Sequence, residues 1–155
     1  MQMQSANIDE NIRRAVQFVH DKANARATGI WMHENDVLHL ELFLPSRQIQ
    51  ECIAGGFAEA TANVPVTDTG LGIVLAARAR QITEYRAVDL PPESGSGYWL
   101  RAFRADRSVA VPFFDKNGDL KRILSVAVVG LEIPTQTYSS IIQEAFQLYL
   151  KACNE

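Results

Sequence analysis

Three histidines are the side chains best suited to ligate a metal ion or haem. His33 and His39 flank a predicted turn between two strands, where they can approach each other, and imidazole nitrogens bind several transition metals. No third ligand lies near them in the sequence, and His20 falls alone in a predicted helix. We therefore interpret all three as non-ligating histidines and predict no metal site.

The two cysteines are the next candidates for chemistry. Cys52 and Cys153 are far apart, and neither belongs to a CxxC motif or a Cys/His cluster. Such isolated cysteines indicate neither a zinc site nor a disulfide framework, and reduced thiols are typical of a cytoplasmic protein. A redox role for Cys52, as in a thiol-dependent reductase, stays open as a minor hypothesis.

Motifs of the common enzyme classes are missing from the sequence. There is no Gly-x-Ser-x-Gly elbow, no phosphate-binding loop and no HExxH helix. Gly70-Leu71-Gly72 is too short for a dinucleotide fingerprint, and Ser94-Gly95-Ser96-Gly97 does not link a strand to a helix as that fingerprint requires. We predict no catalytic residues, and the sequence identifies no cofactor.

Length and composition narrow the class of protein further. The 155 residues suit one domain over positions 1–155, with 47% hydrophobic and 21% charged residues. A net charge of −3 gives no electrostatic reason to expect nucleic acid or an anionic membrane as a partner. No apolar run approaches the roughly 20 residues of a membrane span, and no secretory signal is visible. These features predict a cytoplasmic protein.

A strand hairpin near the C-terminus is the strongest structural signal. Ser108–Phe114 and Ile123–Val129 are apolar at nearly every position, which is typical of strands covered on both faces. Asn117-Gly118 between them is a hairpin signal, because both residues tolerate positive φ. We therefore predict that this hairpin forms the centre of a sheet with a layer on each side.

Other segments supply the predicted layers. Periodicity predicts a first helix over 8–25 capped by Asn7, and strands over 30–33 and 37–44. In the second of these strands, Leu38, Leu40, Leu42 and Leu44 are expected on one face. Residues 47–63 form either one helix or two short pieces around Gly55-Gly56. The elements predicted after them are helix 71–79, strand 81–85, flexible loop 89–97, helix 98–104 and closing helix 135–153.

This order predicts an α+β fold or a mixed α/β sandwich. The terminal helices would cover one face of an antiparallel central sheet, and the middle short helices and loops would cover the other. Apolar residues predicted on the closing helix are Tyr138, Ile141, Ile142, Ala145, Leu148, Tyr149 and Ala152.

The order and four of its segments resemble the GAF domain, a small-molecule-binding sensory module of phosphodiesterases, histidine kinases and bacterial regulators. The segments are Ala27–Met32, Thr69–Val74, Ile82–Tyr85 with Asp89, and the central hairpin with Gly118. The resemblance covers roughly residues 8–150 and implies a pocket between the sheet and the middle helices, lined from Gln81 to Arg107. The ligand-binding residues it implies are Phe43, Tyr85, Asp89, Tyr98, Trp99, Phe103 and Arg104, with the loop 89–97 as a lid.

Three specialised activities of that family lack their residues here. No cysteine between Gln81 and Val129 is present to attach a linear tetrapyrrole, and the two cysteines do not match the set of a free methionine sulfoxide reductase. The Asn-Lys-Phe-Asp-Glu pattern of cyclic-nucleotide binders is absent as well.

The sequence therefore supports two main hypotheses. The first is a sensory module that binds an unidentified small molecule and relays binding through its terminal helices to a protein signalling partner. The second is a ligand-free interaction module with a collapsed pocket. Phe18 and Phe146 lie off the apolar stripes of the terminal helices, so they would suit a homodimer interface, or else extra packing in the core.

Overall fold

An antiparallel sheet of seven strands forms the middle layer of the computed structural model, which describes residues 3–4 and 9–150. The strand order is β1-β3-β2-β7-β6-β5, and β4 pairs with β3 beside this path. The strands are β1 (Met3–Gln4), β2 (Ala27–Glu34), β3 (Val37–Pro45), β4 (Asn63–Pro65), β5 (Thr83–Arg86), β6 (Arg107–Phe114) and β7 (Leu120–Val128). The predicted hairpin is β6–β7, and it lies inside the sheet, as expected.

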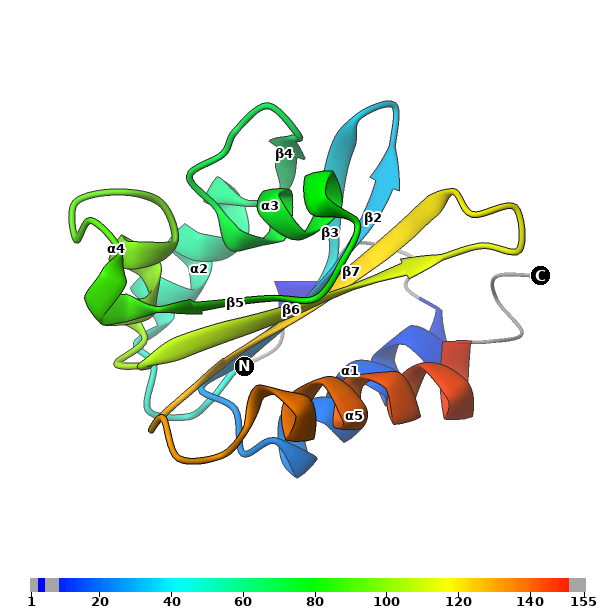
Figure 1. The fold of residues 1–155 in the computed structure, drawn as a ribbon. Coiled ribbons are helices and arrows are strands. Elements are labelled where there is room, and N and C mark those ends of the chain that lie inside the picture. The colour runs from blue at the N-terminus through cyan, green and yellow to red at the C-terminus, as the bar shows by residue number, and fades with distance from the viewer. Residues whose placement is uncertain (1–2, 5–8, 151–155) are drawn as a thin grey trace.

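Helices cover both faces of the sheet (Figure 1). The terminal helices α1 (Glu10–Lys22) and α5 (Thr135–Ala145), which continues as the π-helical turn η2 (Phe146–Leu150), lie on one face. The middle helices α2 (Glu51–Ala60), α3 (Gly72–Ala79) and α4 (Gly95–Ala102) lie on the other, with the 3-10 turn η1 (Ala87–Asp89) before α4. The α+β class and the predicted layers are confirmed.

The first helix begins later than predicted. Asp9 is its N-cap, and its carboxylate accepts a hydrogen bond from the Asn11 backbone N–H at 2.7 Å. Asn7, the predicted cap, lies outside the described residues. At the other end, α1 stops at Lys22 rather than at residue 25, and β2 begins at Ala27, three residues before the strand predicted over 30–33.

A β-bulge in β3 overturns the prediction that its four leucines share one face. Ile30 pairs with Leu42, but the next residue, Trp31, pairs with Leu40, so Glu41 is an extra residue in β3. Leu38 and Leu40 therefore pack toward the middle helices, and Leu42 packs toward the terminal helices.

Two segments without a clear sequence signal are helical. Residues 51–60 form one helix across Gly55-Gly56, rather than two pieces. The predicted flexible loop 89–97 is partly ordered as well, because η1 ends at Asp89 and α4 begins at Gly95, three residues before the predicted start.

The closing helix departs from its predicted apolar face at its last turn. The wider π-helical turn shifts the helical phase, so Leu150 is fully buried while Leu148 remains 56% exposed. Ala152 and Cys153 lie outside the described residues.

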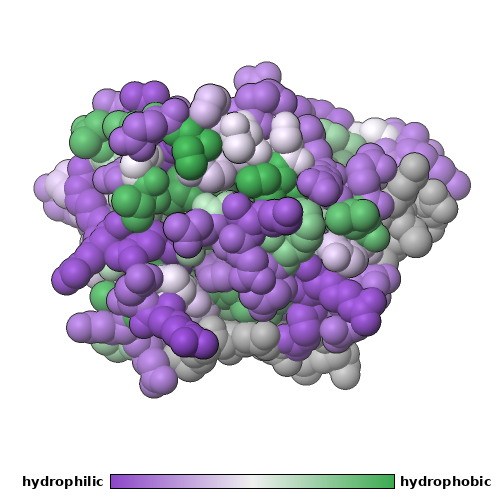
Figure 2. Space-filling view, turned by 90° about the horizontal axis from the view of Figure 1, so that it is seen from below, coloured by the Kyte–Doolittle hydropathy of each residue, from purple (hydrophilic) through white to green (hydrophobic). Residues whose placement is uncertain are grey.

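Phe18 and Phe146 are half-buried against the core of their own chain. The Phe18 ring meets the edge of Tyr149 with 6.0 Å between centroids, and the Phe146 ring stacks on Phe113 at 4.4 Å. The face formed by the terminal helices is largely hydrophilic, with separate hydrophobic patches (Figure 2). Both rings therefore contribute to packing within one chain, and the predicted homodimer interface stays a prediction.

None of the helices in residues 9–150 combines the length and the hydropathy that crossing a lipid bilayer requires.

Candidate functional site

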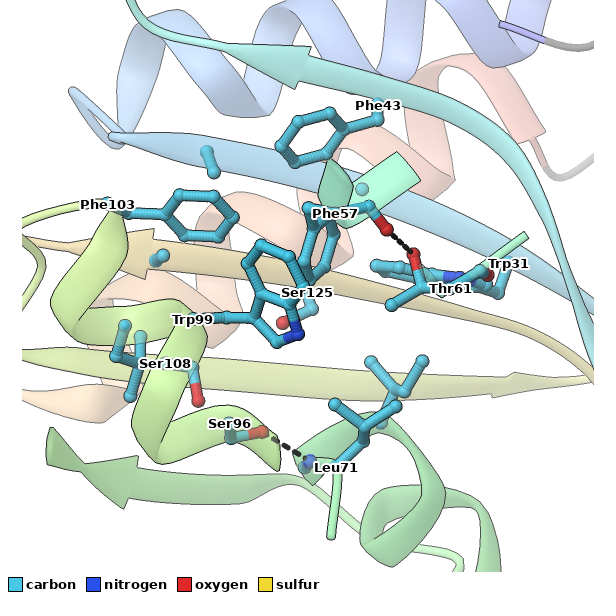
Figure 3. A pocket seen from close by; sticks show the side chains of 16 residues that line it. Trp31, Phe43, Phe57, Thr61, Leu71, Ser96, Trp99, Phe103, Ser108 and Ser125 are labelled. Atoms are coloured by element: carbon cyan, nitrogen blue, oxygen red, sulfur yellow. Dashed lines mark hydrogen bonds between the residues drawn. The ribbon is translucent and has the colours of Figure 1, made fainter. Parts of the chain in front are cut away.

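A cavity of about 50 Å³ lies between the sheet and the three middle helices (Figure 3). Its lining comes from four strands, β2, β3, β6 and β7, and from α2, α3 and α4 with their adjoining turns. This is the position in which the resemblance placed a pocket.

The floor of the cavity is made of small residues that face the same side of the sheet. Gly29 of β2 pairs with Ser125 of β7, and Ala127 of β7 pairs with both Ala27 and Ser108. Paired residues of antiparallel strands share a face, so these short side chains lie together and leave a hollow above them.

The roof is an aromatic cluster of Phe43, Phe57, Trp99 and Phe103. The Phe57 ring is at its centre, with centroid distances of 4.8 Å to Phe43, 5.1 Å to Phe103 and 5.2 Å to Trp99. Tilted and edge-on ring pairs at these distances are favourable contacts. The rings occupy most of the space above the floor, which explains the small volume of the cavity.

Trp31 closes one side and is held in place at both ends of its side chain. A Cβ on Gly29 would lie 2.5 Å from a carbon of the Trp31 ring, so the indole lies directly against the Gly29 backbone. The Trp31 indole N–H donates to the Thr61 carbonyl at 2.9 Å, and the Thr61 hydroxyl donates to the Phe57 carbonyl at 2.9 Å. Trp31 is therefore a fixed wall of the cavity.

The helices α3 and α4 meet at their N-terminal ends beside the cavity. The Ser96 N–H donates to the Gly70 carbonyl at 2.9 Å, and the Ser96 hydroxyl accepts from the Gly72 N–H at 2.8 Å (Figure 3). Gly95 has φ +61°, and a Cβ there would lie 2.2 Å from the Gly70 oxygen. The residues predicted to form a lid thus form a close junction between two helices.

No charged side chain lines the cavity in the described part of the chain. Its polar groups are the hydroxyls of Thr61, Ser96, Ser108 and Ser125 and the indole N–H of Trp99. Such a lining offers hydrogen bonds and apolar contact, but it contains no group suited to general acid–base catalysis.

Three of the seven residues predicted to bind ligand line this cavity: Phe43, Trp99 and Phe103. Tyr85 does not line it, although its ring lies close to the cavity residue Gly72. The side chains of Asp89, Tyr98 and Arg104 are exposed and do not line it either. Tyr98 is next to Trp99 on α4, and its ring meets the Trp99 ring edge-on with 4.9 Å between centroids, without lining the cavity.

The residues predicted to bind ligand did not include Trp31, Phe57 or the two floor serines, Ser108 and Ser125. A glycine and two serines within otherwise apolar strands were the available signal, because small residues facing one side of a sheet leave room for another group. The pairing of Gly29 with Ser125 depends on strand order, which the sequence did not provide.

A second polar cluster lies on the opposite face of the sheet, on β5 and β6. Arg107 is 1% exposed, and its guanidinium donates to Glu84 Oε2 at 3.1 Å and to the Ile133 carbonyl oxygen. Its carbon Cζ lies 4.8 Å from the Tyr138 ring centroid. The Thr135 hydroxyl also donates to Glu84, and this bond lowers the pKa of Glu84 against the opposing effect of burial, with Arg107 lowering it further. The cluster ties β5 and β6 to the start of α5.

The histidines do not come together. His33 pairs with Leu38 and therefore lies on the opposite face of the β2–β3 hairpin from His39, so the expectation that they can approach was wrong. His39 Nδ1 lies 2.7 Å from Asn63 Oδ1, and His20 Nδ1 lies 2.8 Å from Thr28 Oγ1. Across residues 9–150 there is no group of three or more metal-ligating side chains.

Cys52 is exposed on α2 and does not line the cavity.

Comparison with solved structures shows a GAF-like fold. The GAF domain of a two-component sensor histidine kinase from Bacillus halodurans matches with a TM-score of 0.63 and 13% identity, covering 96% of this chain and 97% of that one. Residues 122 to 287 of a methyl-accepting chemotaxis protein match at 0.62 and 18% identity, with 95% and 91% covered. A type II free methionine-R-sulfoxide reductase from Thermoplasma acidophilum matches at 0.61 and 14% identity, with 88% and 85% covered.

No protein-family model matches the sequence, and no curated protein matches it. The expected GAF-like fold is thus confirmed by structure alone.

Proposed function

We propose that this chain is a sensory module that binds a small molecule in the cavity and relays binding through its terminal helices. The observation that carries the proposal is the cavity itself. It has a floor of small residues, an aromatic roof, and unpaired hydrogen-bonding groups in its lining. A sheet face needed only for stability would be filled by larger aliphatic side chains. Sensor proteins among the structures of similar fold, a histidine kinase and a chemotaxis protein, support this function.

The relay would pass through β6. Ser108 lines the cavity, and its neighbour Arg107 contacts Glu84 and the segment that leads into α5. An occupant that displaces β6 would therefore alter the contacts at the start of a terminal helix. Such a change in contacts is what a ligand needs to shift a conformational equilibrium.

Native mass spectrometry of gently purified protein tests this function. We expect a mass above that of the bare chain that disappears on denaturation. Trp99→Ala should lose the bound molecule, whereas the control Val88→Ala, a truncation at an exposed residue that does not line the cavity, should keep it. Bare mass for the unmodified protein, with no small molecule found to bind on screening, would contradict the proposal.

A second candidate is an interaction module that works without ligand, and the small volume of the cavity favours it. In this case the terminal helices would form a homodimer, and a protein partner would bind the dimer. Leu148→Glu is a better test of this dimer than Phe146→Glu. Leu148 is 56% exposed, whereas Phe146 is stacked on Phe113 within its own chain. A ligand-free dimer that becomes monomeric in Leu148→Glu, with unchanged stability, would support this candidate.

A thiol-dependent reductase is the least supported function. The reductase of similar fold favours it, but the residues that line this cavity include no cysteine, and Cys52 lies on the outer surface of α2. Activity toward free methionine sulfoxide that is lost in Cys52→Ser would revive it.

A further inference from the structure

The chemical class of the ligand follows from three properties of the cavity. We infer that it takes an uncharged molecule with a flat ring and one hydrogen-bonding group, an inference that rests on the proposed function. The properties are the absence of charge in its lining, the position of unpaired polar groups, and the half-buried roof side chains that must move to admit a ring.

Charge is the first property. The cavity is lined by aromatic, aliphatic and hydroxyl side chains and by no Lys, Arg, His, Asp or Glu within residues 9–150. An ionic ligand would lose its hydration there without gaining an opposite charge, which is costly in an apolar site. A neutral ligand avoids this cost.

Unpaired polar groups are the second property. In residues 9–150, no acceptor bonds to the Trp99 indole N–H, whereas the Trp31 indole N–H is bonded to Thr61. Figure 3 shows the Trp99 ring across the middle of the cavity, with its nitrogen directed toward the open space. The hydroxyls of Ser108 and Ser125 line the same space from the floor. These groups offer a donor and two donor–acceptors to a single polar atom of a ligand.

Limited space is the third property. A cavity of about 150 Å³ is known to hold benzene, so a ring cannot enter 50 Å³ unless roof residues move. Phe43 and Phe103 are 1% and 3% exposed, and Trp31 is fixed by its hydrogen bond, whereas Phe57 and Trp99 are half-buried. These two rings contact each other with 5.2 Å between centroids, so an entering molecule must separate this pair. A flat ring replaces the ring contacts that the separated pair gives up.

Three probes of equal ring size test this inference at neutral pH: phenol, benzoate and benzylammonium. The chain has two tryptophans, so the ¹⁵N-labelled protein gives two indole N–H resonances, and Trp31→Phe assigns the one from Trp99. We expect phenol to shift the Trp99 resonance in a saturable way, with a Kd at least about tenfold lower than that of either ion. Trp99→Phe, which keeps a ring but removes the donor, should weaken phenol binding by about two- to tenfold, and Tyr98→Phe should leave it unchanged.

The outcomes distinguish a failure of this inference from a failure of the proposed function on which it rests. Binding of benzoate or benzylammonium as tightly as phenol would overturn the uncharged class and leave the sensory function standing. Phenol binding that Trp99→Phe does not weaken would overturn the role of the Trp99 donor. No shift with any probe, together with bare mass in native mass spectrometry, would overturn both the ligand class and the proposed function.

Discussion

Arg107 and Ser108 are consecutive residues of β6 whose side chains lie on opposite faces of the sheet. Ser108 lines the cavity, and Arg107 is buried beside α5, where its guanidinium bonds to Glu84 at 3.1 Å. A single strand position therefore separates the candidate ligand site from the contacts that hold a terminal helix. The importance of that connection can be measured by substituting residues of the cavity or of the Arg107 cluster.

Arg107→Met should destabilise the fold by about 2 kcal/mol, which is less than the loss for a fully buried ion pair because Glu84 is partly exposed. The substitution leaves the Ile133 carbonyl and the Glu84 carboxylate without the guanidinium. Urea denaturation measures the loss. The control is Arg14→Met, whose ion pair with Glu10 is exposed and which should cost less than about 0.5 kcal/mol. Equal losses would show that the Arg107 cluster has no special structural role.

Acid should weaken the fold through Glu84. The hydrogen bond from Thr135 lowers the pKa of Glu84 in the folded protein, aided by Arg107, so the unfolded chain binds this proton more readily. The stability from Glu84 is complete above its unfolded pKa, about 4.3, and is lost as the pH falls through its folded pKa.

The urea midpoint followed from neutral to acid pH tests this effect. Glu84→Gln should lower the midpoint at neutral pH and flatten its fall in acid. Glu144→Gln, an exposed change on α5, should leave the profile of the unmodified protein intact. If the midpoint of Glu84→Gln falls as steeply in acid as that of the unmodified protein, other groups cause the acid sensitivity.

Two glycine-to-alanine substitutions around the cavity should change the stability of the fold in opposite directions. Gly29→Ala places a methyl group 2.5 Å from the Trp31 ring, so the indole must move and lose its bond to Thr61, at a cost of about 1–3 kcal/mol. Gly56 lies inside α2, and a methyl group there would contact the Trp99 ring at an ordinary distance of 3.6 Å. Gly56→Ala should therefore stabilise the protein by about 0.5–1 kcal/mol. Urea denaturation compares them, and destabilisation by Gly56→Ala would mean that the roof is tighter than its geometry indicates.

Gly95→Ala should loosen the junction between α3 and α4. Its methyl group would lie 2.2 Å from the Gly70 oxygen, so the hydrogen bond from the Ser96 N–H to that oxygen should lengthen. Hydrogen exchange of the Ser96 amide should accelerate. Gly118→Ala is the control, since it also has positive φ but nothing within 4 Å, and it should cost only the backbone strain of about 1 kcal/mol. Equal losses of stability in Gly95→Ala and Gly118→Ala would show that the junction accommodates the methyl group at no additional cost.

Much of the fold could be predicted because its signals are local. The apolar runs of β6 and β7, the periodicity of α1 and α5 and the helix α3 depend on neighbouring residues only. These elements in their order are enough to place terminal helices on one face and middle helices on the other. The helix α4 could not be placed correctly, because its first turn is held by Gly70, which is far away in sequence.

The candidate site could be predicted only in part, because a cavity is defined by what meets across the sheet. Phe43, Trp99 and Phe103 were identifiable as large aromatic residues near a resembled pocket. Ser125 and Gly29 line the cavity only because β2 and β7 pair in one register, and sequence patterns do not fix that register.

The extra residue at Glu41 marks a position at which β3 can change its length. Before the bulge the strand contributes Leu40 to the middle-helix side, and after it Leu42 contributes to the terminal-helix side and Phe43 to the cavity roof. Deleting Glu41 would remove the bulge and leave the faces unchanged, because Trp31–Leu40, Ile30–Leu42 and Gly29–Phe43 would then be consecutive pairs of a regular ladder. The loss would be the ion pair between Glu41 and Arg122 at 2.8 Å. Homologous chains that keep this cavity should therefore tolerate a one-residue gap at position 41, where the sheet absorbs a change in length.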